Sequence, residues 1–323
     1  MRSGEFEAIA KYFAPLSGEG AFGLGDDAAI LAPAAGCELV VTNDALAAGV
    51  HFFATDPPGA IAQKALRVNL SDLTAKGATP RAFLMALGLP DEWPEEKIAA
   101  YAAGLAADCE RYGVRLLGGD TFRSPSGLVV SITAFGDVPA GRYRSRSGVA
   151  PGDRLFVTGA IGDAALGLKV REGDAALRAT AEARELLRHY LLPEPPVAFA
   201  PILAAHANGA MDISDGFLGD IGKMAHASNV DFTIRLQHVP FSRGVMDAIE
   251  LPHALETALT GGDDYQLLFS VPVKNLHALR RAMNAAHLDA TEIAVARAGS
   301  GKVTLLAADG EPMHFARTSF AHF

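Results

Sequence analysis

The chain has 323 residues, half of them hydrophobic and 20% charged, and its formal net charge is −9. A chain of this length is expected to fold into two domains, and an acidic chain without a basic stripe is not expected to bind nucleic acid. The longest apolar stretch, Ala82 to Pro90, is too short to span a membrane, and the N-terminal segment lacks the apolar core of a signal peptide. With only two cysteines, the sequence predicts a cytoplasmic protein without membrane or nucleic-acid partners.

The first residues contain a glycine-rich segment between two predicted elements. Glu5 to Phe13 is predicted to form a short amphipathic helix. Gly18 to Gly23 then matches the pattern G-x-G-x-x-G, but no strand precedes it and the next strand is predicted to begin near Ala28. A dinucleotide-binding fingerprint follows a strand and opens a helix, so we reject that interpretation. The glycines are instead predicted to form a flexible loop that leads to Asp26 and Asp27.

A β-branched run leads directly into polar residues in the next strand. Leu39-Val40-Val41 is predicted to be extended because β-branched residues favour strands, and Thr42-Asn43-Asp44 follows at once. The end of a strand is where a scaffold presents polar side chains to a site, so we expect Asp44 at the strand terminus. His51, seven residues after Asp44, is the one histidine tied to this segment.

The next helix carries two polar residues on one side. Pro57-Pro58 and Gly77 bound a helix from about Pro58 to Lys76, in which Asn69 and Asp72 are three residues apart. A surface helix would place both in solvent, but the other acidic motifs of the chain favour a site. Further strands are expected at 82–89, at 114–117 before Gly118-Gly119-Asp120, and at 128–138, with a helix from Pro94 to about Tyr112.

The composition changes at residues 139–153, which contain three arginines, three glycines and two prolines but no apolar run. We therefore predict a first domain at 1–138, a linker at 139–153 and a second domain at 154–323. Arginines in a linker are expected in solvent, although Arg146 could also turn onto phosphate oxygens.

The second half repeats the alternation of strands and helices, which indicates an α/β or α+β fold. Asp212 is predicted on a short strand, 210–213, and both Ser214 and Asp215 are suitable N-caps for the helix that begins near Phe217. Capping explains one of these two residues but not Asp212. The remaining elements are expected as strands at 154–158, 231–236, 266–271, 292–297 and 303–307, and as helices at 162–172, 176–190 and 197–207.

Short acidic motifs beside glycines and apolar runs are the main chemical signal of the sequence. Clustered carboxylates repel one another and are costly to bury without partners, and hard cations such as Mg²⁺, Mn²⁺ or Ca²⁺ would offset that cost. Metals that are held by carboxylates and completed by substrate phosphates imply phosphoryl transfer. The sequence contains no P-loop, no protein-kinase motif set, no serine-hydrolase elbow and no zinc-protease motif.

These motifs, in this order and over nearly the whole chain, make the sequence resemble the thiamine-monophosphate kinase family of the aminoimidazole ribonucleotide synthetase-like superfamily. The resemblance implies an α+β two-domain fold that dimerises through strands of the N-terminal domain. It also implies ATP-dependent, Mg²⁺-assisted phosphorylation of thiamine monophosphate to thiamine diphosphate. The motifs are Gly25-Asp26-Asp27, Asp44 through His51, Asn69-Leu70-Ser71-Asp72, Gly118-Gly119-Asp120, Arg146-Ser147-Gly148, Asp212-Ile213-Ser214-Asp215-Gly216 and Gly261-Gly262-Asp263-Asp264-Tyr265.

The resemblance also implies a role for individual residues, with ATP as co-substrate and several Mg²⁺ ions as cofactor. The positions that match metal ligands are Asp27, Thr42, Asn43, Asp44, Asp72, Asp120, Asp212 and Asp215. The positions that match ATP contacts are Gly119, Asp120, Arg146 and Ser214, and those that match the thiamine monophosphate site are His51, Asp263 and Phe320. Asp44, Asp72, Asp120 and Asp212 are expected to be the catalytic acids.

Two positions depart from the family pattern. Asp263 stands where the family usually has glutamate, which keeps a carboxylate but shortens its reach. Ala102 stands where the family often has an aromatic ATP contact, with Tyr101 beside it. Apart from these departures, two alternatives stay open, namely another ATP-dependent synthetase of the superfamily and a non-catalytic, metal-dependent nucleotide-binding module.

Overall fold

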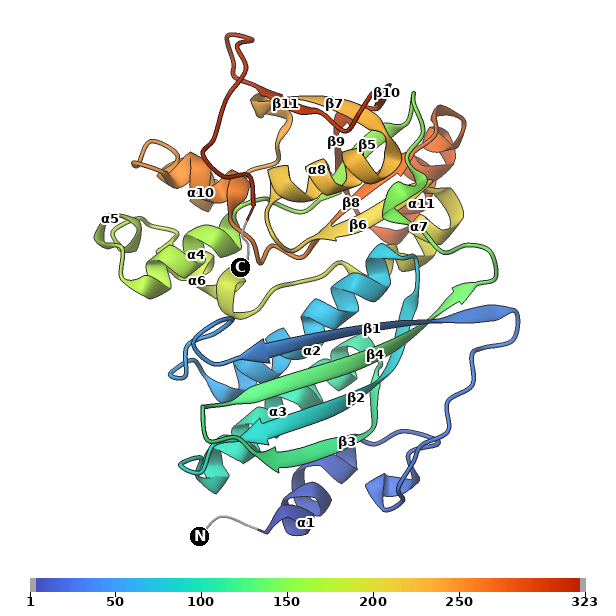
Figure 1. Ribbon diagram of the computed structural model, residues 1–323, viewed down its shortest axis with the longest axis vertical. Coiled ribbons are helices and arrows are strands. Elements are labelled where there is room, and N and C mark those ends of the chain that lie inside the picture. The colour runs from blue at the N-terminus through green and yellow to red at the C-terminus, as the bar shows by residue number, and fades with distance from the viewer. Residues whose placement is uncertain (1–3, 320–323) are drawn as a thin grey trace. The chain divides into compact units, whose positions relative to one another are not determined.

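A computed structural model describes residues 4–319 of the chain, so the predicted substrate residue Phe320 lies outside the described residues. The chain divides into two compact units (Figure 1). The first contains the residues up to Leu73 together with Ala78–Gly141, and the second contains Thr74–Gly77 and the residues from Arg142 onward. The predicted linker at 139–153 contains the point where the first unit ends, but its exact boundaries stay a prediction.

The first unit is built on a four-stranded sheet with the order β1-β4-β2-β3. β1 (Cys37–Ala47) pairs with β4 (Val129–Pro139) and β4 with β2 (Thr79–Leu89), both antiparallel, whereas β2 and β3 (Arg115–Arg123) run parallel. A short helix, α1 (Glu5–Ala8), continues as a π-helical turn to Phe13, so the predicted N-terminal helix is confirmed.

Two long helices cover one face of this sheet, α2 (Pro58–Ala75) and α3 (Glu95–Tyr112) (Figure 1). Burial of Ile61, Leu66 and Leu73 on α2, and of Ile98 and Leu105 on α3, supplies the apolar layer beneath the strands. Removing large apolar side chains from water is the main favourable term in folding, so this layer fixes where both helices lie.

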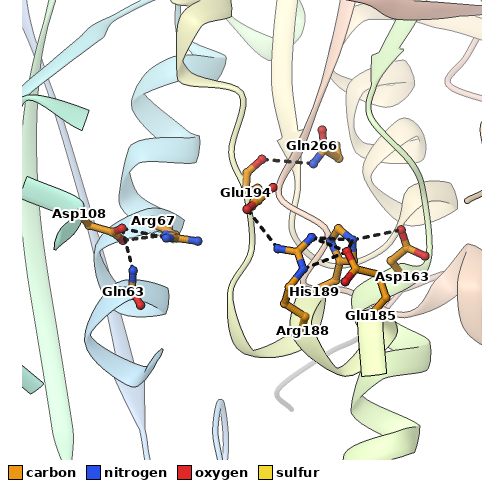
Figure 2. Close-up of polar contacts among 9 residues, drawn as sticks. All are labelled: Gln63, Arg67, Asp108, Asp163, Glu185, Arg188, His189, Glu194 and Gln266. Atoms are coloured by element: carbon orange, nitrogen blue, oxygen red, sulfur yellow. Dashed lines mark hydrogen bonds and ion pairs between the residues drawn. The ribbon is translucent and has the colours of Figure 1, made fainter. Parts of the chain in front are cut away.

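A buried ion pair joins α2 to α3. The Arg67 guanidinium donates from Nε and Nη2 to the two oxygens of Asp108 at 2.7 and 2.8 Å, and Gln63 adds a third donor at 2.9 Å (Figure 2). The side chains of Arg67 and Asp108 are 3% and 1% exposed. Both charges are therefore shielded from water, and each compensates the other, with Gln63 adding a hydrogen bond to the carboxylate.

The second unit has a four-stranded antiparallel sheet between two apolar layers. Its order is β6-β8-β5-β9, formed by Gly209–Ile213, Gln266–Val271, Arg154–Thr158 and Ala290–Val295. Side chains alternate between the faces, so Phe269 packs with Phe199 and Met283, whereas Leu268 packs with Ile221 on the other face. The first layer contains α7 (Ala200–His206) and α11 (Leu276–Ala286), and the second contains α8 (Phe217–Ser228).

Smaller elements complete the second unit. β7 pairs with β10 and with β11 in a three-stranded sheet, and α4 packs against α6 in a separate apolar cluster. The bounds are β7 Val230–Arg235, β10 Arg297–Ala298, β11 Val303–Leu306, α4 Asp163–Glu172, α5 Ala175–Arg178, α6 Ala183–Leu191, α9 Arg243–Ala248 and α10 Ala254–Thr260. Both units combine helices with largely antiparallel sheets, so the chain has the predicted α+β fold.

Three local predictions are wrong. No strand begins near Ala28, because Ile30 N–H bonds to Gly20 and Ala34 N–H bonds to the Asp137 carboxylate instead of to a neighbouring strand. The strands predicted to end at Asp44 and before Gly118 instead continue to Ala47 and Arg123. Each keeps a neighbouring strand beyond the predicted end, and backbone pairing with that neighbour extends the strand through polar residues and glycines.

The predicted caps of α8 are also wrong. Its N-cap is Gly216, and neither Ser214 nor Asp215 caps it by a side-chain hydrogen bond. Most of the other predicted elements are present within a few residues of their expected ends. None of the helices in the described part of the chain combines the length and apolar character needed to cross a membrane.

We predict that Asp108→Asn lowers the free energy of unfolding by about 3–5 kcal/mol, because it removes the carboxylate charge that faces the buried Arg67 guanidinium. Urea denaturation monitored by circular dichroism measures this loss. The matched control is Asp91→Asn, which removes the exposed partner of Arg123 and is expected to leave stability nearly unchanged. Equal stability of the two variants would contradict a structural role for the buried pair.

Candidate functional site

Two side-chain contacts connect β1 to α2 in the first unit. Thr42 Oγ1 donates to Asp72 Oδ2 at 2.6 Å, and the backbone N–H of Asp44 donates to Asn69 Oδ1 at 3.0 Å. Asn69 is fully buried and is itself held by a bond from its amide to the carbonyl of Ala65. Asn69 and Asp72 therefore share one side of the helix, as predicted, and that side faces the strand that carries Thr42 and Asp44.

Asn43 and Asp120 occupy the other face of the same sheet. Across the four strands, Asp120 pairs with Ala86, Ala86 with Ser131, and Ser131 with Ala45. Asp120 therefore aligns with Ala45, the residue after Asp44, and not with Asp44 itself. Successive side chains of a strand point to opposite faces, so these aligned residues belong to the face of Asn43. Asn43 donates from Nδ2 to Thr133 Oγ1 at 2.9 Å on that face. The first unit thus divides its predicted metal ligands between two faces.

The remaining predicted residues of this unit lie in or beside loops and in β3. Asp27 is exposed in the segment before β1. His51 accepts a hydrogen bond at Nδ1 from the N–H of Ala47 at 3.1 Å, which leaves Nε2 as the protonated nitrogen of a neutral ring. Gly119 has φ +149°, and a Cβ there would lie 1.8 Å from the carbonyl oxygen of Met85. The contact with Met85 by itself requires glycine at position 119, so this glycine is not evidence for a nucleotide site.

The second unit brings four predicted residues into one region after β6. Asp212 is nine-tenths buried on β6, and Ser214 and Asp215 follow directly. The N–H of Asp263 donates to the carbonyl of Ser214 at 2.9 Å. A Cβ at Gly262 would lie 2.2 Å from that same carbonyl oxygen, so glycine is required for the two segments to approach this closely.

A carboxylate that the sequence analysis did not single out holds this segment. Asp220 is fully buried, and its Oδ2 accepts from the N–H groups of Ser214 and Asp215 at 3.0 and 2.9 Å. Its Oδ1 accepts from Lys223 Nζ at 2.7 Å, and the same ammonium also bonds to Asp215 Oδ2. Burial raises the pKa of the Asp220 carboxyl, while Lys223 and the amide of Asp215 act in the opposite direction. Asp220 thereby fixes the backbone of both predicted site residues.

Arg146 lies away from Ser214, although both positions were assigned to ATP. Its carbonyl accepts a hydrogen bond from Ser228 at the C-terminal end of α8, whereas Ser214 precedes the N-terminus of that helix. The 12 residues of α8 span about 18 Å. The second unit alone therefore does not bring Arg146 to Ser214, and the Arg146 side chain is exposed.

The donor chemistry of the predicted ligands suits Mg²⁺, since carboxylate, hydroxyl and amide oxygens are the ligands that hard cations prefer. Within residues 4–319, however, no three acidic, histidine or cysteine side chains gather closely enough to hold a metal ion. Thr42 and Asp72 are in contact, and Asp212 and Asp215 belong to one segment, so each unit supplies a partial oxygen donor set.

Asp220 and Lys223 are the supporting residues that sequence reasoning missed, whereas Asn69 was placed beside Asp72 but without a contact to the backbone of Asp44. The helical spacing of three residues from Asp220 to Lys223 is the signal that could have found this pair. An acid in the first turn of a helix is also expected near backbone N–H groups, as Asp220 is here.

Comparisons with known proteins match both halves of the chain to domains of AIR synthase related proteins. Residues 25–138 match the AIR synthase related protein, N-terminal domain, and residues 150–306 match the corresponding C-terminal domain. The thiamine-monophosphate kinase of Escherichia coli (strain K12) is 36% identical over 326 residues, covering 100% of this chain and 99% of the relative.

Two solved structures are similar over most of their length. The thiamine-monophosphate kinase from Stenotrophomonas maltophilia K279a is 37% identical with a TM-score of 0.80, covering 90% of this chain and 91% of the other. A structure described as "AaThiL complexed with AMPPCP and TMP" is 28% identical with a TM-score of 0.77, covering 99% of each chain.

We predict that Asp220→Ala lowers the free energy of unfolding by about 1–3 kcal/mol more than Asp220→Asn. The asparagine keeps an oxygen that can accept from both backbone N–H groups, whereas alanine leaves these donors without an acceptor. Urea denaturation of both variants measures the difference, with the exposed Asp247→Asn as control. Equal losses for asparagine and alanine would show that only the charge facing Lys223 matters.

Proposed function

Because the chain belongs to the thiamine-monophosphate kinase family, we propose that it transfers the γ-phosphoryl group of ATP to thiamine monophosphate, giving thiamine diphosphate. It is an enzyme, a thiamine-phosphate kinase. The proposed substrates rest on one observation above all, the likeness over 99% of the chain to a structure described as complexed with AMPPCP and TMP. AMPPCP is a non-hydrolysable ATP analogue, and TMP in that protein family denotes thiamine monophosphate.

The attacking group in this reaction is a phosphate oxygen that is already anionic near neutral pH, so no strong general base is required. The barrier is set by repulsion between two anionic phosphates and by their alignment. Bound Mg²⁺ would offset that repulsion. We infer direct transfer, because no single aspartate or histidine stands out as a nucleophile that would carry a phosphoryl group.

We assign the metal-binding role to the oxygen donors of both units. In the first unit these are Asp27, Thr42, Asn43, Asp44, Asp72 and Asp120, and in the second Asp212 and Asp215. The contacts of Thr42 with Asp72 and of Asp44 with Asn69 support this assignment, because they fix two acids before any ligand binds. Asp44, Asp72, Asp120 and Asp212 are the proposed catalytic acids.

The proposed ATP contacts are Gly119, Asp120, Arg146 and Ser214, and the proposed thiamine monophosphate contacts are His51, Asp263 and Phe320. The backbone hydrogen bond from Asp263 to Ser214 supports this role, since a carboxylate held in place beside a substrate can pair with a cationic thiazolium. His51 would donate from Nε2, because its Nδ1 already accepts from Ala47.

We also propose a cytoplasmic homodimer that binds neither membranes nor nucleic acid. The exposed side chains of Val41 and Phe122 on the open face of the first sheet support an interface formed by N-terminal strands. The alternatives from the sequence are another ATP-dependent synthetase of the superfamily and a non-catalytic nucleotide-binding module. Identity at the level of 36–37% over nearly full length to kinases of one specificity favours the kinase.

We predict that the purified chain converts thiamine monophosphate to thiamine diphosphate with ATP and Mg²⁺, and that Asp72→Asn lowers turnover at least about 100-fold. The substitution removes charge at nearly constant volume, and its amide oxygen can still accept from Thr42, so the fold is expected to persist. Chromatographic product assays together with melting curves measure both effects, with Asp247→Asn as the matched control. Free thiamine lacks the phosphate nucleophile and should not be phosphorylated. Turnover of free thiamine, or wild-type rates for Asp72→Asn, would contradict the proposal.

Asp263 provides a separate test of the substrate side. We predict that Asp263→Ala raises the Michaelis constant for thiamine monophosphate about tenfold or more, with a smaller effect on that for ATP, because a charge-assisted contact is lost. Asp263→Glu, the residue usual in the family, should retain activity. Steady-state kinetics with each substrate varied in turn measures both constants. A change in the Michaelis constant for ATP alone would contradict this assignment and indicate that Asp263 contacts the nucleotide.

A further inference from the structure

A cavity of about 330 Å³ lies within the second unit, between the start of α4, the end of α6 and the turn before β9. Such a volume is at the lower end of the range for small-molecule sites. Its polar lining comes chiefly from Asp163, His189, Glu194, Asp264 and Gln266. Of the described residues assigned to the proposed reaction, none lines this cavity. The cavity therefore has no role in the function described so far.

Most polar groups of the lining already have partners inside the protein. The two oxygens of Asp264 accept from the N–H groups of Gly162 and Ala164 at 2.8 and 3.3 Å. Gln266 accepts from Thr158 Oγ1 at 2.9 Å and donates to the carbonyl of Glu194 at 3.4 Å (Figure 2). These groups shape the cavity but have little capacity left for a ligand.

Asp163 differs from these groups. Its side chain is only 6% exposed, and its Oδ1 accepts a hydrogen bond from Ser242. Within residues 4–319 its Oδ2 accepts no hydrogen bond, and His189 Nε2 lies 3.8 Å from it, at ion-pair distance but beyond hydrogen-bonding distance (Figure 2). That imidazole nitrogen also lies 3.4 Å from Glu185 Oε1 and 3.2 Å from Arg188 Nη2. One oxygen of this largely buried carboxylate, at the cavity wall, therefore has no hydrogen-bond donor in the described part of the chain.

The charges that line the cavity favour a positively charged ligand. Burial raises the pKa of the Asp163 carboxyl and raises that of Asp264 well above its ordinary value. Ionisation of these buried carboxyl groups is therefore costly, and a cation beside them would lower that cost. The neighbouring Arg188 is already used, because its guanidinium bonds to Glu185 and Glu194 at 2.7 and 3.1 Å. The apolar part of the lining includes Pro196, Phe199 and Leu288.

We propose that this cavity binds a small organic cation whose N–H group donates a hydrogen bond to Oδ2 of Asp163. The apolar wall suits a compact hydrocarbon or heterocyclic body, and a bare metal ion would find too few uncommitted oxygens. The N–H group has two possible sources, a separate amine or the aminopyrimidine of thiamine monophosphate. Only the second source rests on the proposed function.

Isothermal titration calorimetry on the full chain, without ATP or Mg²⁺, tests the proposal with a matched pair of probes. Benzylamine carries the cation and benzyl alcohol has a similar size without the charge. We expect benzylamine to bind at least about tenfold more tightly than the alcohol, and Asp163→Asn to remove that preference. Asp309→Asn, which removes an exposed carboxylate of a turn outside the cavity, should bind benzylamine as the wild type does.

A second variant keeps the test decisive if Asp163→Asn fails to fold. Ala160→Leu fills the cavity without changing charge and should also abolish benzylamine binding. Displacement of benzylamine by thiamine monophosphate would identify the substrate as the source of the cation, and independent binding would identify a separate amine. Equal affinity for both probes, or undiminished benzylamine binding in the folded variants, would overturn the proposal. Because no turnover is measured, this failure is distinct from failure of the kinase assignment.

Discussion

The first unit depends on the way α2 is held between a strand and a second helix. Thr42 and the backbone of Asp44 bond to Asp72 and Asn69 on one side of α2, and Arg67 bonds to Asp108 of α3 on another. The contacts come from three residues on different sides of α2, so rotation or sliding of the helix would break several of them together. A helix that is fixed in this way presents Asp72 in one orientation, which would suit the role in phosphoryl transfer that we propose for it.

In the second unit, hydrogen bonds from backbone N–H groups hold the segment that carries Ser214 and Asp215. The segment from Ile213 to Gly216 leaves a buried strand and must satisfy its N–H groups before α8 begins. Asp220 does this for Ser214 and Asp215, and the glycine at 262 lets the opposing segment bond to the same stretch. In both units, side chains outside the predicted ligand set hold the backbone of predicted ligands, an arrangement that commonly orients metal ligands in proteins.

Two buried carboxylates in the second unit, Asp220 and Asp163, differ in how many of their oxygens accept hydrogen bonds from the protein. Asp220 accepts two backbone hydrogen bonds and faces the ammonium of Lys223, so its charge is compensated within the fold. Asp163 is similarly buried, yet among residues 4–319 only Ser242 donates a hydrogen bond to it, and it lines a cavity. A buried ionised group is costly unless it is paired, so the first arrangement is complete and the second is open to a cation.

The sequence by itself determined most strands and helices, because apolar periodicity and β-branched runs are local properties. It also predicted that Asn69 and Asp72 share one side of a helix, since helical spacing alone decides that. It could not predict that β1 continues through Asp44 to Ala47, because that extension depends on pairing with β4, far away in the chain.

Contacts between distant segments likewise decided how the candidate residues are grouped. Only strand register separates Asp120 from Thr42 and Asp44, and only the packing of α8 places Ser214 and Arg146 at its two ends. The cavity beside Asp163 is formed by residues from 158 to 289, whose proximity no local pattern encodes. Local propensities therefore determined the elements and the residue types of the site, whereas long-range hydrogen bonding and burial determined which of those residues meet.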